Sequence, residues 1–220
     1  MTQTIHTFSR RIARRLTLDY LLHLPPAYPQ RKSHPLILFL HGSGERGSDV
    51  NVIRQHGIPK IVEQQPEFPF IALSPQCPCD STWFMQRDAL LMLLDFVMTK
   101  HAVDVKRVYL TGLSMGGYGA WYLGSEHPEH FAAVAPICGG YDDMLGYPER
   151  VASLRHTPVW AFHGAKDGQV PLSETTTLVH ALRKAGGNVK LTVYRDAGHD
   201  AWTRTYADPR LYRWLLQQHK

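Results

Sequence analysis

The chain has 220 residues, 44% of them hydrophobic, which is enough for one domain with a sizeable core, and we expect a single domain over residues 1–220. Its formal net charge is +5, but the basic residues are spread along the chain apart from one cluster, RRIARR at 10–15. Because no recognition motif accompanies that cluster, the composition argues against a nucleic-acid-binding protein.

The first structured segment, LTLDYLLHL at 16–24, is expected to be a strand with one buried face, because apolar and polar residues largely alternate in it. Asp19 and His23 interrupt it where a signal peptide needs a continuous apolar region, and no small-residue cleavage site follows. Nowhere does an apolar run approach the roughly 20 residues of a membrane span. We therefore expect a soluble, cytoplasmic protein.

The glycine-rich motif HGSGERG at 41–47 follows the apolar run 36–40 and allows two interpretations. Its glycines fit G-x-G-x-x-G, the loop that binds a dinucleotide pyrophosphate, but such a loop must open directly into a helix. Here Gly57 and Pro59 interrupt the following segment, and no acidic residue ends the next apolar run. The remaining interpretation is a loop whose backbone N–H stabilises an oxyanion.

Six apolar runs rich in β-forming residues alternate with helical stretches. Hydrophobicity that is continuous, rather than alternating, is typical of parallel strands covered on both faces. The runs lie at 36–40, 70–74, 108–112, 132–137, 159–164 and 190–194. Helices are expected at 88–98, from Gly116 to before Pro128, and from Ser173 to Gly186. A last helix is expected to begin with Asp208 as its N-cap and Pro209 as its first residue. These elements predict an α/β fold with a mostly parallel sheet, helices on both faces, and the 16–24 strand added antiparallel at the edge.

A candidate nucleophile lies in the motif GLSMGG at 112–117, directly after the third apolar run. Strand, G-x-S-x-G and helix in succession are typical of a tight turn that exposes a serine at the carboxyl end of a sheet. Gly112 and Gly116 leave room for the cramped backbone around Ser114. A serine at its ordinary pKa is a poor nucleophile, so this turn also requires a base and a group that orients the base.

Two later loops provide those groups. Asp167 follows the fifth apolar run in the motif HGAKDGQVP, and His199 follows the sixth in the motif GHDAW. The order Ser114, Asp167, His199 is the one expected for this fold, and all three residues leave the carboxyl ends of strands. Asp196, three residues before His199, is an alternative orienting group.

Taken in this order, the four motifs between Leu36 and Leu216 resemble those of compact α/β-hydrolases. The similar groups are the phospholipase/carboxylesterase, dienelactone-hydrolase-like and polyhydroxybutyrate-depolymerase-like esterases, including members called predicted peptidases. The resemblance implies an oxyanion hole formed by the backbone N–H groups of Ser43 and Met115, with His41 packing beneath the loop. Dienelactone hydrolases proper use a cysteine nucleophile, whereas this chain has a serine. The resemblance therefore does not imply dienelactone hydrolysis.

Four further residues are candidates for the substrate pocket. Glu45 and Arg46 either shape the pocket or pair with each other to hold the loop. Trp83 and Trp202, both in expected loops, either form a pocket wall or pack in the core. The segment between the fourth and fifth apolar runs is too short for a large helical lid, which predicts an open, shallow site.

Metal and redox chemistry are not expected. Cys77, Cys79 and Cys138 are too few and too irregularly spaced for a disulfide framework or a zinc site, so we expect them to be reduced. His127 and His130 flank the dipeptide PE, and the proline argues against two histidines on one helical face. No metal or organic cofactor is therefore predicted.

The sequence as a whole predicts a serine carboxylesterase that cleaves short-chain esters of small molecules through an acyl-enzyme. Three alternatives stay open: a peptidase or amidase with the same triad, a thioesterase or lysophospholipase, and a binding protein on a silent hydrolase scaffold. The oligomeric state is not determined by the sequence.

Overall fold

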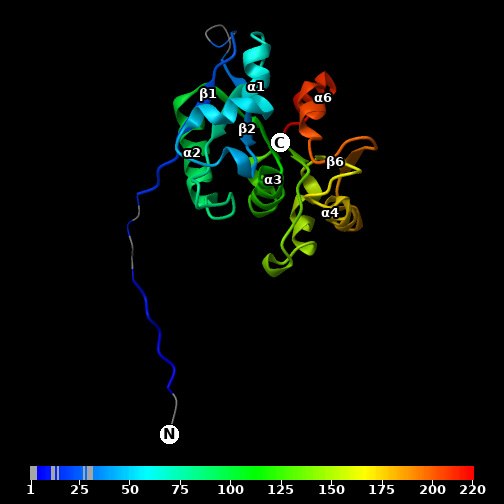
Figure 1. The fold of residues 1–220 in the computed structure, drawn as a ribbon. Helices are drawn as coiled ribbons and strands as arrows, with labels where there is room; N and C mark the ends of the chain where they lie inside the picture. The colour runs from blue at the N-terminus through cyan, green and yellow to red at the C-terminus, as the bar shows by residue number, and fades with distance from the viewer. Residues whose placement is uncertain (1–3, 11–12, 14, 27, 29–31) are drawn as a thin grey trace.

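The computed structural model describes residues 4–10, 13, 15–26, 28 and 32–220; Arg11, Ile12 and Arg14 of the basic cluster lie outside the described residues. The chain folds around a seven-stranded sheet with the strand order β1-β3-β2-β4-β5-β6-β7. Figure 1 shows helices on both faces of this sheet. The strands are β1 (Tyr20–His23), β2 (His34–Leu40), β3 (Ile71–Pro75), β4 (Val103–Leu113), β5 (Ala133–Ile137), β6 (Val159–Gly164) and β7 (Val189–Tyr194).

The predicted α/β architecture is confirmed. Every neighbouring pair in the sheet is parallel except β1 and β3, which are antiparallel at the edge. Only Tyr20–His23 of the expected 16–24 strand is paired, because β3 has just five residues to offer as a partner. The carboxyl ends of all six parallel strands therefore lie along one edge of the sheet, where an open α/β sheet binds ligands.

Two separate hydrophobic clusters explain the continuous apolar runs. In β2, Leu36, Leu38 and Leu40 pack into the cluster on one face, while Ile37 and Phe39 pack into the cluster on the other. All five side chains have 0% exposure. Because neighbouring residues of a strand point to opposite faces, a strand covered on both sides must be apolar at every position.

The helices divide between the two clusters. Helices α2, α3 and α4 contribute buried residues to one cluster, and α1, α5 and α6 contribute to the other. Their bounds are α1 (Gly57–Gln64), α2 (Arg87–Lys100), α3 (Met115–Glu126), α4 (Leu172–Lys184), α5 (Trp202–Ala207) and α6 (Pro209–Leu216). Among the described residues, each helix falls short of the length and apolarity that crossing a membrane would require.

The expected interruption is present, because the 3₁₀ helix η3 (Val50–Gln55) ends before Gly57, but a helix that the sequence did not predict, α1, begins there. Gly57 and Pro59 both lie in the first turn of this helix. Proline is tolerated there because the first N–H groups of a helix have no intrahelical acceptor. Gly57 has a φ of +64°, and a Cβ at this position would collide with the ring of Phe39. The glycine is therefore needed to let α1 lie close against β2.

The connection from β5 to β6 forms two 3₁₀ helices, η5 (Asp143–Leu145) and η6 (Glu149–His156), rather than a lid domain. Helix η6 packs against α3 and α4, and its buried residues are Val151 and Leu154. This connection is consequently fixed against α3 and α4.

Helix α6 gives a direct test of a cap that the sequence predicted. The Asp208 side chain accepts a hydrogen bond from the Arg210 backbone N–H, and Pro209 is the first helical residue. Replacing Asp208 with Ala removes this acceptor and is expected to lower the free energy of unfolding by about 1 kcal/mol. Asp208→Asn retains an acceptor and should lose much less, as measured by urea denaturation; equal losses in both variants would contradict the cap.

Candidate active site

The turn between β4 and α3 holds Ser114 in a strained conformation. Its φ is +52° and its ψ is −118°, a region that residues other than glycine adopt only when the surrounding structure imposes it. A Cβ on Gly112 would collide with the Gly116 carbonyl, and a Cβ on Gly116 would collide with the Leu40 carbonyl. The two glycines thus allow strand, turn and helix to meet, and Ser114 stands at the carboxyl edge of the sheet.

The structure brings Ser114, His199 and Asp167 into one chain of hydrogen bonds. His199 Nε2 lies 2.9 Å from Ser114 Oγ, and His199 Nδ1 lies 2.7 Å from Asp167 Oδ2. The three residues come from the loops that follow β4, β6 and β7. Ser114 can donate its proton to Nε2 while the Nδ1–H donates to the carboxylate, which is the arrangement that acyl transfer requires.

Asp167 is held as a carboxylate. Its side chain has 0% exposure, and this burial alone would raise its pKa. Hydrogen bonds from His199 and from the backbone N–H groups of Val170 and Gln169 outweigh the effect of burial, so the pKa of Asp167 is lowered. The alternative, Asp196, is 69% exposed and forms a bidentate pair with Arg204. The geometry therefore favours Asp167 as the partner of His199.

His163 was not singled out by the sequence, and it lies directly beneath the acid. Its Nε2 is 3.3 Å from Asp167 Oδ2 and 2.9 Å from the Val170 carbonyl, and its Nδ1 is 2.8 Å from Thr175 Oγ1. The side chain is fully buried in β6, where it resembles an ordinary strand residue. Its position four residues before Asp167 is the only signal that the sequence offered. His163 ties the acid loop to α4.

Cys138 also contacts the base, although the sequence left it without a role. It follows β5 with a φ of +48°, and its Sγ lies 3.1 Å from the His199 carbonyl oxygen. Burial raises the pKa of the thiol to about 12, so this cysteine is a weak nucleophile. All three cysteines are free, as expected.

The two residues expected to form the oxyanion hole each begin a helix. Met115 is the first residue of α3 and Ser43 the first of η2 (Ser43–Glu45), so both amides are at helix starts, where an N–H has no intrahelical acceptor. The position that a Gly42 Cβ would take is 3.6 Å from Ser114 Cβ. The loop after β2 therefore lies against Ser114.

His41 anchors this loop from below. It is 1% exposed; its Nδ1 donates to the Gly42 carbonyl at 2.6 Å, and its Nε2 accepts the Cys77 backbone N–H at 2.9 Å. Burial lowers the pKa of His41 to about 4, so the ring is neutral at pH 7. A neutral imidazole with both nitrogens engaged acts as a fixed support for the loop.

Glu45 and Arg46 do not pair with each other among the described contacts. Arg46 instead donates to the Ser43 and Ser81 carbonyls. Glu45 is 8% exposed, lies 3.8 Å from His56 Nε2, and has one carboxylate oxygen without a hydrogen-bond partner. Neither residue lines the main pocket described below; both instead lie along the loop that carries Ser43.

The two tryptophans have different surroundings. Trp83 is buried, donates its indole N–H to the His41 carbonyl at 2.9 Å, and also lines the pocket, so it combines both predicted roles. Trp202 packs edge to face on the His199 ring at 5.1 Å between centroids and is absent from the pocket wall. Trp202 therefore shields the base rather than contacting a ligand in the pocket.

A pocket of about 800 Å³ opens beside Ser114. It is larger than the shallow site that the sequence suggested, because four distant segments build it: 82–84, α3, the connection between β5 and β6, and Glu174 of α4. Its aromatic lining consists of Trp83, Phe84, Tyr118, Trp121, Tyr122, Tyr141 and Tyr147, and its charged lining of Asp142, Asp143 and Glu174. No basic side chain is among the described residues that line this pocket.

Comparison with known proteins gives consistent results. Residues 84–210 match the model of the Dienelactone hydrolase family. A crystal structure of a thermostable esterase is 34% identical, with a TM-score of 0.79, over 92% of this chain and 60% of that one. A protein of Escherichia coli (strain K12) with a provisional assignment as carboxymethylenebutenolidase is 25% identical over 89% of this chain and 62% of its own length. A ferulic acid esterase, 22% identical with a TM-score of 0.67, shares the fold.

The chain spans only part of its curated relatives. It covers 62% of the length of the Escherichia coli protein, and 39% of a Yersinia pestis protein with the same provisional assignment that is 33% identical over 109 residues.

The choice between the two aspartates can be tested by a matched pair of variants. Asp167→Asn leaves the shape unchanged but removes the charge and favours the wrong tautomer of His199, so kcat should fall by about 10⁴. Asp196→Asn only breaks an exposed pair with Arg204 and should leave kcat within about twofold. Steady-state hydrolysis of p-nitrophenyl acetate measures both, and the reverse order of effects would assign the acid to Asp196.

Proposed function

This chain belongs to the dienelactone hydrolase family, and on that premise we propose that it is a serine carboxylesterase that hydrolyses short-chain esters through an acyl-enzyme. The observation that carries the proposal is the pair of contacts made by His199, at 2.9 Å to Ser114 Oγ and 2.7 Å to Asp167 Oδ2. A serine in a strained turn, in contact with a base that a buried carboxylate orients, is the arrangement of an activated nucleophile.

In the first half of the proposed reaction, Ser114 Oγ attacks the ester carbonyl while its proton moves to His199 Nε2. The charge that develops on the carbonyl oxygen is stabilised by the Ser43 and Met115 amides. Asp167 stabilises the imidazolium that forms and keeps Nδ1 protonated. His199 then gives the proton to the leaving alcohol, and the acyl group stays on Ser114.

The second half reverses the proton transfers with water. His199 takes a proton from a water molecule, which attacks the acyl carbonyl and forms a second tetrahedral intermediate in the same oxyanion hole. The intermediate collapses, Ser114 recovers its proton from His199, and the carboxylic acid leaves. No step in this sequence needs a group other than these side chains, two backbone amides and water.

The pocket beside Ser114 supports a substrate with one flat, bulky side. Aromatic side chains suit a planar group, which can stack on them or meet them edge to face. A long alkyl chain is less well suited, because it would bring methylenes against Glu174 and the aspartates of the connection. We propose that this pocket takes an aromatic or similarly compact part of the ester, and that the other side of the ester is small.

Labelling with a fluorophosphonate probe tests the nucleophile. The probe should label the protein covalently, and Ser114→Ala should abolish labelling and lower kcat by about 10⁴ to 10⁶. Ser125→Ala is a control, because Ser125 lies near the far end of α3 and its hydroxyl donates to the Trp121 carbonyl. Labelling that persists in Ser114→Ala, or that is absent in the wild-type protein, would overturn the proposal, and the second result would favour a silent scaffold.

The same preparation can identify the bond that is cleaved. Among p-nitrophenyl esters, turnover should be fastest at about two to four acyl carbons. Burying a methylene in a fully apolar channel contributes roughly 0.8 kcal/mol of binding free energy, and we expect each further methylene of the acyl chain to gain little of it here. A rate that rises steadily to long chains would favour the lysophospholipase alternative. Faster cleavage of thioesters, or of unactivated peptides, would favour the thioesterase or the peptidase.

The acidic lining of the pocket predicts discrimination by charge. Methyl benzoate should be hydrolysed with a kcat/KM roughly tenfold higher than methyl 4-carboxybenzoate, whose anion would be repelled by nearby carboxylates. Glu174→Gln should raise kcat/KM for the anionic ester and so reduce the difference between the two esters. Asp95→Asn, which changes an exposed residue of α2, should leave this difference unchanged. Equal kcat/KM values for the two esters in the wild-type protein would contradict the prediction.

A further inference from the structure

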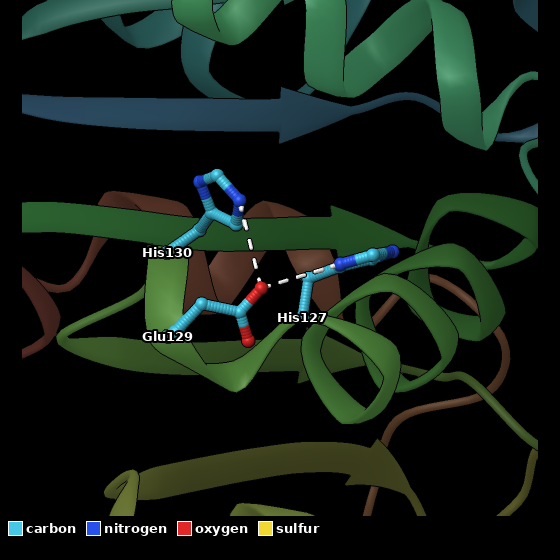
Figure 2. A group of neighbouring side chains, drawn as sticks. All are labelled: His127, Glu129 and His130. Carbon is cyan, nitrogen blue, oxygen red and sulfur yellow. Dashed lines mark hydrogen bonds and ion pairs between the residues drawn. The ribbon is translucent and has the colours of Figure 1, made fainter.

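The turn that follows α3 gathers three potential metal ligands away from the active site. His127 ends the helix, and η4 (Pro128–His130) adds Glu129 and His130. Figure 2 shows both imidazole rings turned toward the Glu129 carboxylate. From the sequence these histidines are not expected to share a helical face, because Pro128 lies between them. The 3₁₀ turn that the proline begins brings them together by a different route.

The spacing of the three groups suits coordination better than hydrogen bonding. Glu129 Oε1 lies 3.4 Å from His127 Nδ1 and 3.6 Å from His130 Nε2, and the three ligand atoms all lie within 4.8 Å of one another. A good N–H···O bond is shorter, at about 2.7 to 3.2 Å. Ligand atoms on a tetrahedral ion with bonds of about 2.0 to 2.2 Å are separated by about 3.3 to 3.5 Å. Small side-chain rotations would therefore complete the geometry.

The backbone that carries these side chains is held in place. His130 and Phe131 donate their backbone N–H groups to the His127 and Pro128 carbonyls, at 3.1 and 3.2 Å. Phe131 is 1% exposed and anchors the turn in the core. Lys220 Nζ donates to the Glu129 and His130 carbonyls at 2.7 and 3.0 Å. A fixed backbone lowers the conformational entropy that a bound ion must offset.

The side chains themselves remain accessible to an ion from solvent. Those of His127 and His130 are 31% and 25% exposed, and that of Glu129 is 64% exposed. The Lys220 ammonium bonds to backbone carbonyls of the turn. Within the described residues, the Glu129 carboxylate forms its ion pairs with the His127 and His130 imidazoles. One side of the cluster therefore faces water, which can supply the fourth ligand.

We propose that His127, Glu129 and His130 form a binding site for a divalent transition-metal ion, with Zn²⁺ as the best match. Two imidazole nitrogens and one carboxylate oxygen are donors that Zn²⁺ accepts, with water in the fourth position. The site is separate from the proposed triad, because α3 has 12 residues and places its far end about 18 Å from Ser114. Bound metal would cross-link the end of α3 to the start of β5 rather than take part in ester hydrolysis.

Isothermal titration of tag-free, chelator-treated protein with ZnCl₂ tests this site. We expect one Zn²⁺ per chain, and at least about tenfold weaker binding in each of His127→Ala, Glu129→Gln and His130→Ala, since each variant leaves only two protein ligands. His180→Ala, which removes an exposed histidine of α4, is the matched control and should bind as the wild-type protein does. Substitution with Co²⁺ should give a visible absorption band that these three variants lose.

Three outcomes would overturn the proposal. Unchanged Zn²⁺ binding in all three variants would show that the ion binds elsewhere; loss of binding in His199→Ala alone would assign it to the triad region, where Cys138, Asp167 and His199 also offer ligand atoms close together. Absence of binding in the wild-type protein would leave the cluster as ordinary surface pairs. Circular dichroism and ester hydrolysis should be the same in all three variants as in the wild-type protein, which excludes unfolding as the cause of lost binding.

Discussion

The site depends on one close approach of backbones, where the ends of β2 and β4 meet the start of α3. No side chain fits at Gly112 or Gly116, because a Cβ at either position would strike a carbonyl group of a neighbouring segment. This contact forces the chain to turn within a single residue between strand and helix. Ser114 occupies that residue in a conformation that costs about 1 to 3 kcal/mol. The surrounding core offsets this cost and holds the hydroxyl at the sheet edge.

With Ser114 held at that edge, short loops suffice to bring Asp167 and His199 to it. Asp167 leaves β6 and His199 leaves β7, and parallel pairing aligns the ends of these strands. A carboxylate that is fully buried would be costly without partners. Asp167 accepts from two backbone amides and from His199, and His163 supports it from beneath. These contacts are all within the protein, so the acid is positioned before any ligand arrives.

The sequence predicted the strands well because two buried faces leave a continuous apolar pattern, and it predicted α6 from its cap. It failed where local rules had more than one outcome. Helix α1 was not predicted, because Gly57 and Pro59 follow the break after η3 and also form the first turn of this helix. The pocket could not be foreseen, since its walls come from segments that meet only after folding. His163 escaped notice because a buried histidine in a strand has no distinguishing pattern.

Geometry and specificity are encoded in different parts of this molecule. The turn, the acid loop and the base loop are constrained by backbone contacts, so the chemistry that they can perform is common to many proteins with this fold. The pocket is instead lined by segment 82–84, α3, the connection after β5 and Glu174 of α4, most of which lies outside the turn that holds Ser114. Charge illustrates the difference. A net charge of +5 would by itself suggest attraction of anions, yet the described charged residues that line the pocket are Asp142, Asp143 and Glu174. Because nearby charges in a partly enclosed pocket are screened less than distant ones on the surface, the proposed preference for uncharged over anionic esters follows from the local carboxylates and not from the net charge.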